Sequence, residues 1–242
     1  MYYYVFLGAL LLCALFASWA SIKVRSTYNA FRADKTSSNM TGYDTAVRLL
    51  RANDVEGISV EKVDGELTDH YNPKKALVNL SESTYGDDSV ASVAVAAHEI
   101  GHVLQKKNGY VPYKIRTALV PLANIGSFLA IPLVLLGIVL EIALAANKPG
   151  TGLNVAMIGV AAYGLSTLFT LVTLPVELDA SRRAKNMLIE EGILTDEEMY
   201  GAGKVLKAAA MTYVAALATS LVYFLRFLWY VLMIFGGGKR KK

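Results

Sequence analysis

Residues 93–105, VAVAAHEIGHVLQ, decide how this chain folds. The segment is apolar and rich in alanine, with no helix breaker before Gly101, so it predicts one buried helix. On a helix, positions i and i+4 share a face about one turn apart, so His98 and His102 point the same way. Two imidazoles at this spacing can bind one zinc ion, and Glu99 is placed to act on a zinc-bound water. This H-E-x-x-H pattern is typical of zinc metallopeptidases.

The alternative interpretation is a pair of hydrogen-bonded core histidines beside a surface glutamate. The chain has only three histidines, and two of them flank Glu99 inside a strongly apolar helix. Burying two imidazoles and a carboxylate without partners would be costly. The pattern therefore favours a metal site over an accidental arrangement.

The composition indicates a membrane protein. Of the 242 residues, 54% are hydrophobic and the mean hydropathy is +0.39, which is too apolar for an ordinary soluble domain. The basic residues lie mostly beside apolar runs, which indicates topology signals rather than nucleic-acid binding. The single cysteine, Cys13, excludes an intrachain disulfide and a cysteine-based zinc site.

Four apolar runs predict membrane crossings. Residues 2–22 are uncharged and precede Lys23 and Arg25, which indicates an uncleaved anchor with its N-terminus outside. Residues 117–145 and 153–175 predict a hairpin of two spans joined by the turn 147–152, with basic clusters at the cytoplasmic ends.

The last run, about 208–235, leaves two alternatives open. One crossing would place the basic tail 239–242 outside, against the positive-inside tendency. Alternatively, Arg226 marks a break between a buried helix and an interfacial one. We expect a fourth crossing.

Residues 23–116 predict a cytoplasmic zincin-like segment. Residues 41–52 predict an amphipathic helix, and 57–63 and 76–80 alternate like short strands of a small β hairpin, joined through the turn Asp64-Gly65 and the loop 68–73. Asp87 or Asp88 is expected to cap the metal-binding helix. The small sheet is expected to line the cleft and to bind an extended substrate by strand addition.

A third metal ligand must lie on the same side of the membrane as His98 and His102. Glu177 follows the third span and is the most economical choice, on a helix expected to begin near Pro175 and end near Gly192. Asp179 and Ser181 are candidates to orient a ligand imidazole. The alternative for Glu177 is an acidic residue at a helix N-terminus.

His70 has two open interpretations. It is a candidate donor to the oxyanion that forms during catalysis, or a structural histidine in a loop. As a fourth ligand it would close the metal site.

The expected fold is thus a mainly α membrane protein with a zincin-like H-E-x-x-H helix, a small β hairpin and about four transmembrane helices. Its segments are an anchor at 1–22, the zincin-like segment at 23–116, a transmembrane hairpin at 117–175, cytoplasmic helices carrying the third ligand at 176–207, and a fourth transmembrane helix with a basic tail at 208–242. The sequence Thr195-Asp196-Glu197-Glu198 predicts a capping box at the start of the last helix.

The chain resembles the bacterial neutral zinc metallopeptidases of the YugP type along nearly its whole length. The resemblance rests on four blocks in the same order: DHYNP at 69–73, AVAAHEIGH at 94–102, LPVELDASRRA at 174–184 and AAAMTYVAA at 208–216. It implies a peptidase of the bacterial cytoplasmic membrane, with His98, His102 and Glu177 at the metal positions and Glu99 as the catalytic acid-base.

More distantly, the chain is similar to the HtpX-type heat-shock proteases and the CAAX prenyl proteases. Those families carry a Glu-x-x-Ala-Asp block, whereas this chain has Glu177 to Ser181 as ELDAS. Ser181 therefore stands at the position of their histidine-supporting aspartate. Whether Ser181 or Asp179 supports a histidine stays open at this point.

The predicted function is hydrolysis of peptide bonds at the cytoplasmic face of the membrane, with one zinc ion per chain. The expected substrate is a peptide or a membrane protein. The chain is expected to lie in the lipid bilayer and to have no nucleic-acid partner. The alternative is a non-catalytic membrane scaffold or regulatory protein with a structural metal site. Structural zinc sites usually have four protein ligands, and three are found here, which favours catalysis. A transporter is a weaker alternative, because the spans lack matched polar groups at mid-membrane.

Overall fold

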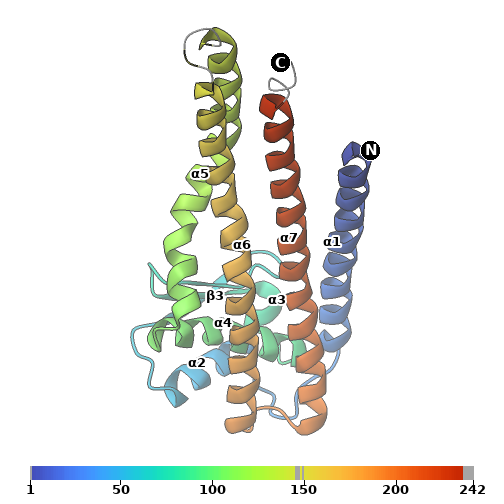
Figure 1. Ribbon diagram of the computed structural model, residues 1–242. Coiled ribbons are helices and arrows are strands. Elements are labelled where there is room, and N and C mark those ends of the chain that lie inside the picture. Colours follow the sequence, from blue (N-terminus) through green and yellow to red (C-terminus); the bar gives the residue numbers. More distant parts are fainter. Residues whose placement is uncertain (1, 145–147, 149, 237–242) are drawn as a thin grey trace. The chain divides into compact units, whose positions relative to one another are not determined.

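The computed structural model describes residues 2–144, 148 and 150–236, which are mainly helical (Figure 1). These residues form seven helices and one three-stranded sheet, in the order α1 (Tyr2–Arg32), α2 (Gly42–Ala52), β1 (Ser59–Val63), β2 (His70–Asn72), β3 (Leu77–Ser81), α3 (Glu82–Tyr85), α4 (Val90–Lys107), α5 (Val111–Leu144), α6 (Thr151–Glu190) and α7 (Asp196–Gly236). The basic tail 239–242 and residues 147 and 149 of the predicted turn 147–152 lie outside the described residues.

Four of the described helices, α1, α5, α6 and α7, are long and apolar enough to cross a membrane, so the expected fold class is confirmed. One expectation about helix ends is wrong, because α6 continues through Pro175 rather than beginning there. Helix α7 continues through Arg226, so the alternative of a break at this residue is not observed. A proline removes one backbone hydrogen bond, and a long apolar helix with good helix formers on both sides tolerates that loss.

The chain divides into two compact units. The described residues of Met1–Ala17, Ile115–Thr173 and Val214–Lys242 form the first unit, which contains only helical segments among its described elements. Its helices α5 and α6 approach through small residues: a Cβ added at Gly137 would lie 2.5 Å from the carbonyl oxygen of Gly152. Close backbone contact of this kind is how apolar helices associate within a bilayer.

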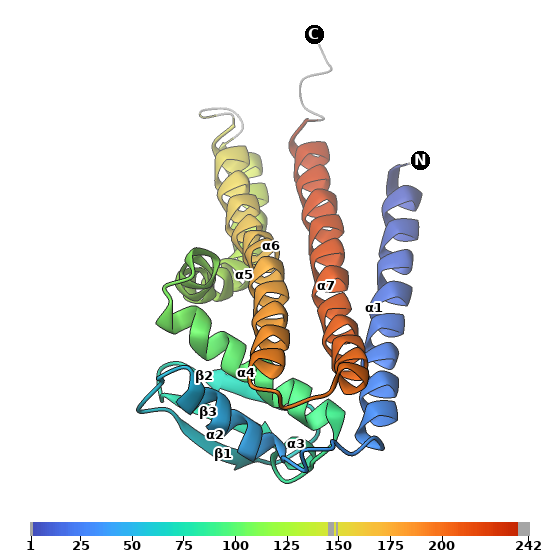
Figure 2. The same ribbon diagram turned by 90° about the horizontal axis from the view of Figure 1, so that it is seen from below.

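The second unit, Ser18–Lys114 and Leu174–Tyr213, contains the sheet and the H-E-x-x-H helix. Helix α2 packs against α4, and β2 and β3 also contact α4 (Figure 2). The core of this unit is formed by fully buried apolar side chains such as Leu49 of α2, Leu80 of β3 and Ile100 of α4. Helix α4 is therefore enclosed on several sides, as its apolar sequence predicts.

The sheet has the strand order β1-β3-β2, with β1 parallel and β2 antiparallel to β3. A β hairpin is present, but it consists of β2 and β3, so the expected hairpin of strands 57–63 and 76–80 is wrong. The two strands expected from the sequence, β1 and β3, are parallel neighbours. Strand β2 lies in the segment 68–73, which was predicted as a loop because its Asp, Asn and Pro residues favour turns. Backbone pairing with β3 makes it a strand.

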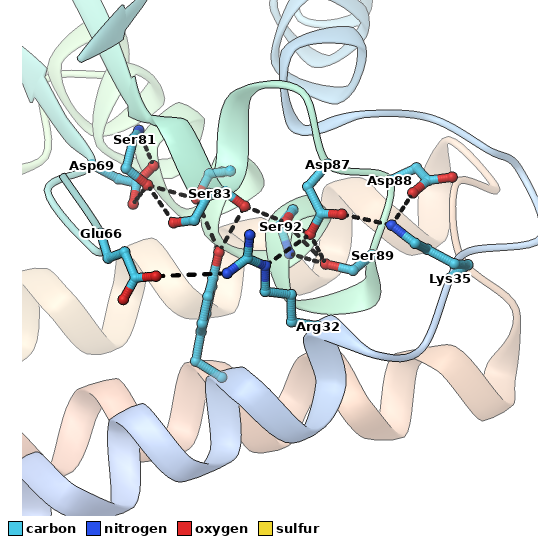
Figure 3. Close-up of polar contacts among 12 residues, drawn as sticks. Arg32, Lys35, Glu66, Asp69, Ser81, Ser83, Asp87, Asp88, Ser89 and Ser92 are labelled. Atoms are coloured by element: carbon cyan, nitrogen blue, oxygen red, sulfur yellow. Dashed lines mark hydrogen bonds and ion pairs between the residues drawn. The ribbon is translucent and has the colours of Figure 1, made fainter. Parts of the chain in front are cut away.

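The start of α4 also differs from expectation. The N-cap is Ser89, whose hydroxyl accepts a hydrogen bond from the backbone N–H of Ser92, and not Asp87 or Asp88. The Asp87 carboxylate instead accepts hydrogen bonds from the hydroxyls of Ser89 and Ser92, at 2.7 and 2.8 Å, and from Lys35 Nζ at 2.6 Å (Figure 3). Asp87 thus supports the cap, and its ion pair with Arg32 at 3.7 Å links it to α1.

The capping box expected at the start of α7 is confirmed. The backbone N–H of Thr195 donates to Glu198 Oε2 at 2.7 Å, and the backbone N–H of Glu198 donates to Thr195 Oγ1 at 3.4 Å. This reciprocal pair satisfies two backbone donors that the first helical turn leaves without partners.

Candidate metal centre

His98 and His102 of α4 meet Glu177 of α6 inside the second unit. Their ligand atoms all lie within 4.8 Å of one another. The Nε2 atoms of His98 and His102 lie 3.3 and 3.4 Å from the same carboxylate oxygen, Glu177 Oε2. Glu177 is 2% exposed and His102 8% exposed, so the cluster is shielded from solvent. The three residues that the sequence analysis selected as ligands are therefore brought together.

The spacing of these donors fits a zinc ion. Around a tetrahedral zinc with ligand distances of about 2.0 to 2.1 Å, neighbouring ligand atoms lie ~3.3 Å apart. The two histidine-to-glutamate distances, 3.3 and 3.4 Å, match this value. Two imidazoles and one carboxylate are also the protein ligands of many catalytic zinc sites, which keep a fourth position for water.

Gly101 explains how α4 and α6 come close enough to form the cluster. A Cβ at this position would lie 2.5 Å from the carbonyl oxygen of Ala180 and 3.1 Å from its Cα. Both are backbone atoms, which cannot rotate away. Glycine at position 101 is thus required by the close approach of the two helices that carry the ligands.

Gln105 determines which nitrogen of His102 carries a proton. Its side-chain Nε2 donates to the carbonyl oxygen of Val176 at 2.7 Å and to Asp179 Oδ2 at 3.0 Å. With both amide hydrogens donated, the amide oxygen lies 3.0 Å from His102 Nδ1 and accepts a hydrogen bond from the Nδ1–H group. The lone pair of His102 is then on Nε2, which faces the cluster, as metal binding requires.

Ser181 and Asp179 support different histidines. Ser181 Oγ lies 3.2 Å from His98 Nδ1, so it contacts a ligand imidazole directly. Asp179 reaches His102 only through Gln105. Arg183 Nε also donates to Asp179 at 2.6 Å, which holds the carboxylate in place.

Glu99 is buried beside the two histidines. Burial raises the pKa of Glu99; the charges of His102 and His98 oppose this effect, while those of Asp69 and Glu177 add to it. A carboxylate with a raised pKa is a stronger base, and general bases work best when their pKa is near the working pH. The environment of Glu99 therefore suits proton transfer.

The pKa of His102 is raised as well. Burial disfavours its charged form and would lower the pKa, but the hydrogen bond and charge of Glu177 outweigh that effect. The charge of Glu99 raises the pKa of His102 further. A proton on Nε2 would compete with a metal ion, so metal binding should weaken as the pH falls.

His70 lies outside this cluster, since the His-His-Glu group found among the described residues does not include it. Its side chain is exposed, with Nδ1 2.8 Å from the carbonyl oxygen of Thr68 and Nε2 3.1 Å from Asn79 Nδ2. Its role as an oxyanion donor stays a prediction. The neighbouring Asp69, which the sequence analysis did not select, accepts hydrogen bonds from the backbone and hydroxyl of Ser81 at 2.8 and 2.9 Å.

Gln105 is a second residue that the sequence analysis did not select. A signal was present, because it is a polar residue one turn after His102 on a helix that is otherwise apolar at its centre. It is fully buried, and buried amides need partners.

Comparison with known proteins gives a consistent result. The model of the family described as "Putative neutral zinc metallopeptidase" matches residues 4–232. A curated relative, "Putative membrane protease YugP" of Bacillus subtilis (strain 168), is 40% identical over 221 residues, which cover 91% of this chain and 92% of the relative. No solved structure matches the chain. With its H-E-x-x-H helix and four apolar helices, this protein belongs to the neutral zinc metallopeptidase family of membrane proteins.

Proposed function

We propose that this protein is a membrane zinc peptidase that hydrolyses peptide bonds at the cytoplasmic face of the membrane, with one zinc ion per chain. The observation that carries the proposal is the meeting of His98, His102 and Glu177, in which both histidine-to-glutamate distances match the ligand spacing of a tetrahedral zinc site. The family assignment supports the same chemistry.

His98 Nε2, His102 Nε2 and a Glu177 oxygen would hold the zinc ion. When bound, zinc lowers the pKa of a coordinated water and polarises the scissile carbonyl. Glu99 accepts the proton of the attacking water and passes it to the leaving amine nitrogen. Gln105 and Ser181 keep the Nδ1 atoms of the histidines hydrogen bonded, so their Nε2 atoms stay available for the metal.

The sheet supplies a surface for an extended substrate. Within the described residues, β2 is an edge strand that pairs only with β3, and it contacts α4. An unpaired strand edge can bind another chain through backbone hydrogen bonds. We therefore propose that a peptide, or an extended segment of a membrane protein, binds along β2 beside the metal centre.

The distribution of basic residues supports a metal centre on the cytoplasmic side of the membrane. Lys106, Lys107 and Lys114 precede the apolar run of α5, and Arg182 and Arg183 follow that of α6. Basic residues of this kind remain in the cytoplasm. The metal ligands lie in the same segments of the chain.

The test compares wild type with Glu99→Gln and Glu177→Ala in detergent, measuring zinc per chain by elemental analysis and cleavage of fluorescein-labelled casein. We expect one zinc in wild type and in Glu99→Gln, with cleavage by Glu99→Gln reduced by about 10²- to 10⁴-fold. Glu177→Ala should lose zinc. Glu56→Gln, which changes an exposed carboxylate, is the matched control.

Undiminished cleavage by Glu99→Gln would refute the role of Glu99. Full zinc in Glu177→Ala would refute the ligand set. A wild-type protein that holds zinc and shows no cleavage of casein or of membrane-protein substrates would favour the non-catalytic scaffold.

A further inference from the structure

A groove with a volume of about 570 Å³ lies between α1 and α7 in the second unit. It contains none of the metal-centre residues. We call it the α1/α7 groove, and the residues that matter for its chemistry are Trp19, Lys23 and Phe31 of α1 and Lys204, Lys207 and Met211 of α7.

The groove carries positive charge without an acidic partner. Lys23, Lys204 and Lys207 are exposed, and no residue that lines the groove is acidic. Among the ion pairs between described residues, none involves these three lysines; Lys204 Nζ lies 4.9 Å from the centre of the Tyr200 ring. Three lysines that line one groove favour an anionic ligand.

The lysines also mark the boundary between the polar and apolar parts of both helices. In α1, Lys23 is the first charged residue after the uncharged run 2–22. In α7, Lys207 is the last charged residue before the uncharged run 208–225. Basic side chains at the cytoplasmic end of a membrane helix lie at the level of the lipid headgroups, where they attract anionic lipids.

The walls of the groove are apolar on the side of these runs. Trp19 is 50% exposed, although it is a large aromatic side chain, and Met211 lies one turn beyond Lys207 on α7. Tryptophan is enriched at the membrane interface, where its ring contacts the glycerol and upper acyl region. A small soluble anion would leave this apolar surface exposed, whereas a lipid would cover it.

Helices α1 and α7 are in close contact near Phe31, one of the residues that line the groove. A Cβ added at Gly201 of α7 would lie 2.7 Å from the Phe31 ring. The groove is thus lined both by lysines and by apolar side chains. This lining suits a ligand with an anionic head and apolar chains.

We propose that the α1/α7 groove binds an anionic phospholipid, with the headgroup phosphate between Lys23, Lys204 and Lys207 and the acyl chains against Trp19 and Met211. This inference does not depend on peptidase activity, and its test does not use it.

The test uses Trp19 as the reporter. The chain has two tryptophans, so Trp229→Phe leaves only Trp19. The full-length protein is placed in phosphatidylcholine bilayers that contain either brominated phosphatidylglycerol or brominated phosphatidylcholine at the same mole fraction. We expect stronger quenching of Trp19 by the brominated phosphatidylglycerol, and weaker quenching by it in high salt.

Lys204→Gln/Lys207→Gln should lower the relative affinity for phosphatidylglycerol by about 30-fold. Lys74→Gln/Lys75→Gln removes the same charge from an exposed segment before β3 and should leave the quenching unchanged. Wild-type zinc content in the groove variant would show that the metal-centre unit is folded.

Equal quenching by the two brominated lipids, or equal loss in the two double variants, would overturn the proposal. Relief of quenching by millimolar inorganic phosphate would also overturn it, because the site would then recognise a soluble anion rather than a lipid.

Discussion

Replacing Gly101 with alanine should disrupt the metal centre without touching a ligand. The added Cβ would lie 2.5 Å from the carbonyl oxygen of Ala180, whereas ordinary contact begins at 3.4 Å, so α4 and α6 must separate by about 0.9 Å. His98 and His102 lie on one helix and Glu177 on the other. A metal site needs its ligands held within about 0.5 Å, so this shift is large enough to weaken zinc binding.

The magnitudes follow from two opposing effects. Overpacking costs about 1 to 3 kcal/mol, and alanine has a helix propensity about 1 kcal/mol better than glycine. The net loss of stability is therefore small, on the order of 0 to 2 kcal/mol. Catalytic activity should fall by about 100-fold, because a displacement of about 1 Å at a reacting centre has that effect.

The assay is zinc affinity, measured by competition with a chelator, together with thermal unfolding in detergent. Gly203→Ala is the matched control, since Gly203 is also helical but its added Cβ would meet only the flexible end of Lys185, at 3.6 Å. We expect Gly203→Ala to bind zinc normally and to be as stable as wild type or slightly more stable. Wild-type zinc affinity in Gly101→Ala would refute the reasoning that this close approach positions the ligands.

Three further predictions concern the surroundings of the site. Gln105→Leu leaves the three candidate ligands in place but should lower zinc affinity by about 10- to 100-fold, because His102 loses its Nδ1 partner. Chelator competition at pH 7 measures the affinity, and an unchanged value would contradict this prediction. Ser181→Ala should weaken zinc binding in the same assay, because His98 loses its hydrogen-bond partner at Nδ1. Ser181→Asp should restore zinc binding, and equal affinities of the two variants would contradict the role of this hydrogen bond. For Asp87, burial disfavours the charge, but hydrogen bonds from Lys35 and two serine hydroxyls outweigh it and hold the pKa below its usual value. A lowered pKa stabilises the folded state above the unfolded-state pKa of about 3.9 and loses that effect as the pH falls through the folded pKa. Asp87→Asn should therefore be less stable than wild type by on the order of 1 to 2 kcal/mol between pH 5 and 8, and the difference should shrink below about pH 4; a pH-independent difference in denaturant unfolding would argue against this carboxylate.

The local sequence pattern was sufficient to predict the elements that need no contact with distant residues. The i, i+4 spacing of His98 and His102 needs only a helix, and four long apolar runs need only the thickness of a bilayer. Glu177 was selected by topology, because two spans return the chain to the side of the histidines. The structure brings these three residues together.

Two errors at element boundaries have a common cause. Pro175 predicted a helix start, and Asp87 or Asp88 predicted a helix cap, because each residue type usually marks such a boundary. In the structure α6 passes through Pro175, and Asp87 is hydrogen bonded to Lys35, so Ser89 becomes the cap. At the start of α4, a contact with the distant Lys35 outweighed the local preference. At Pro175, the good helix formers on both sides of the proline outweighed it.

By itself, the sequence determined the H-E-x-x-H helix, the choice of Glu177 as the candidate third ligand and the apolar helices typical of a membrane protein. Only the tertiary structure decided that β2 is a strand and that Gly101 must be small. It also decided that Gln105 connects Asp179 to His102 and that three lysines line one groove between α1 and α7. The physical reason is that each of these features depends on residues far apart in the chain. Their contacts exist only once helices and strands have packed, and no local periodicity records that packing.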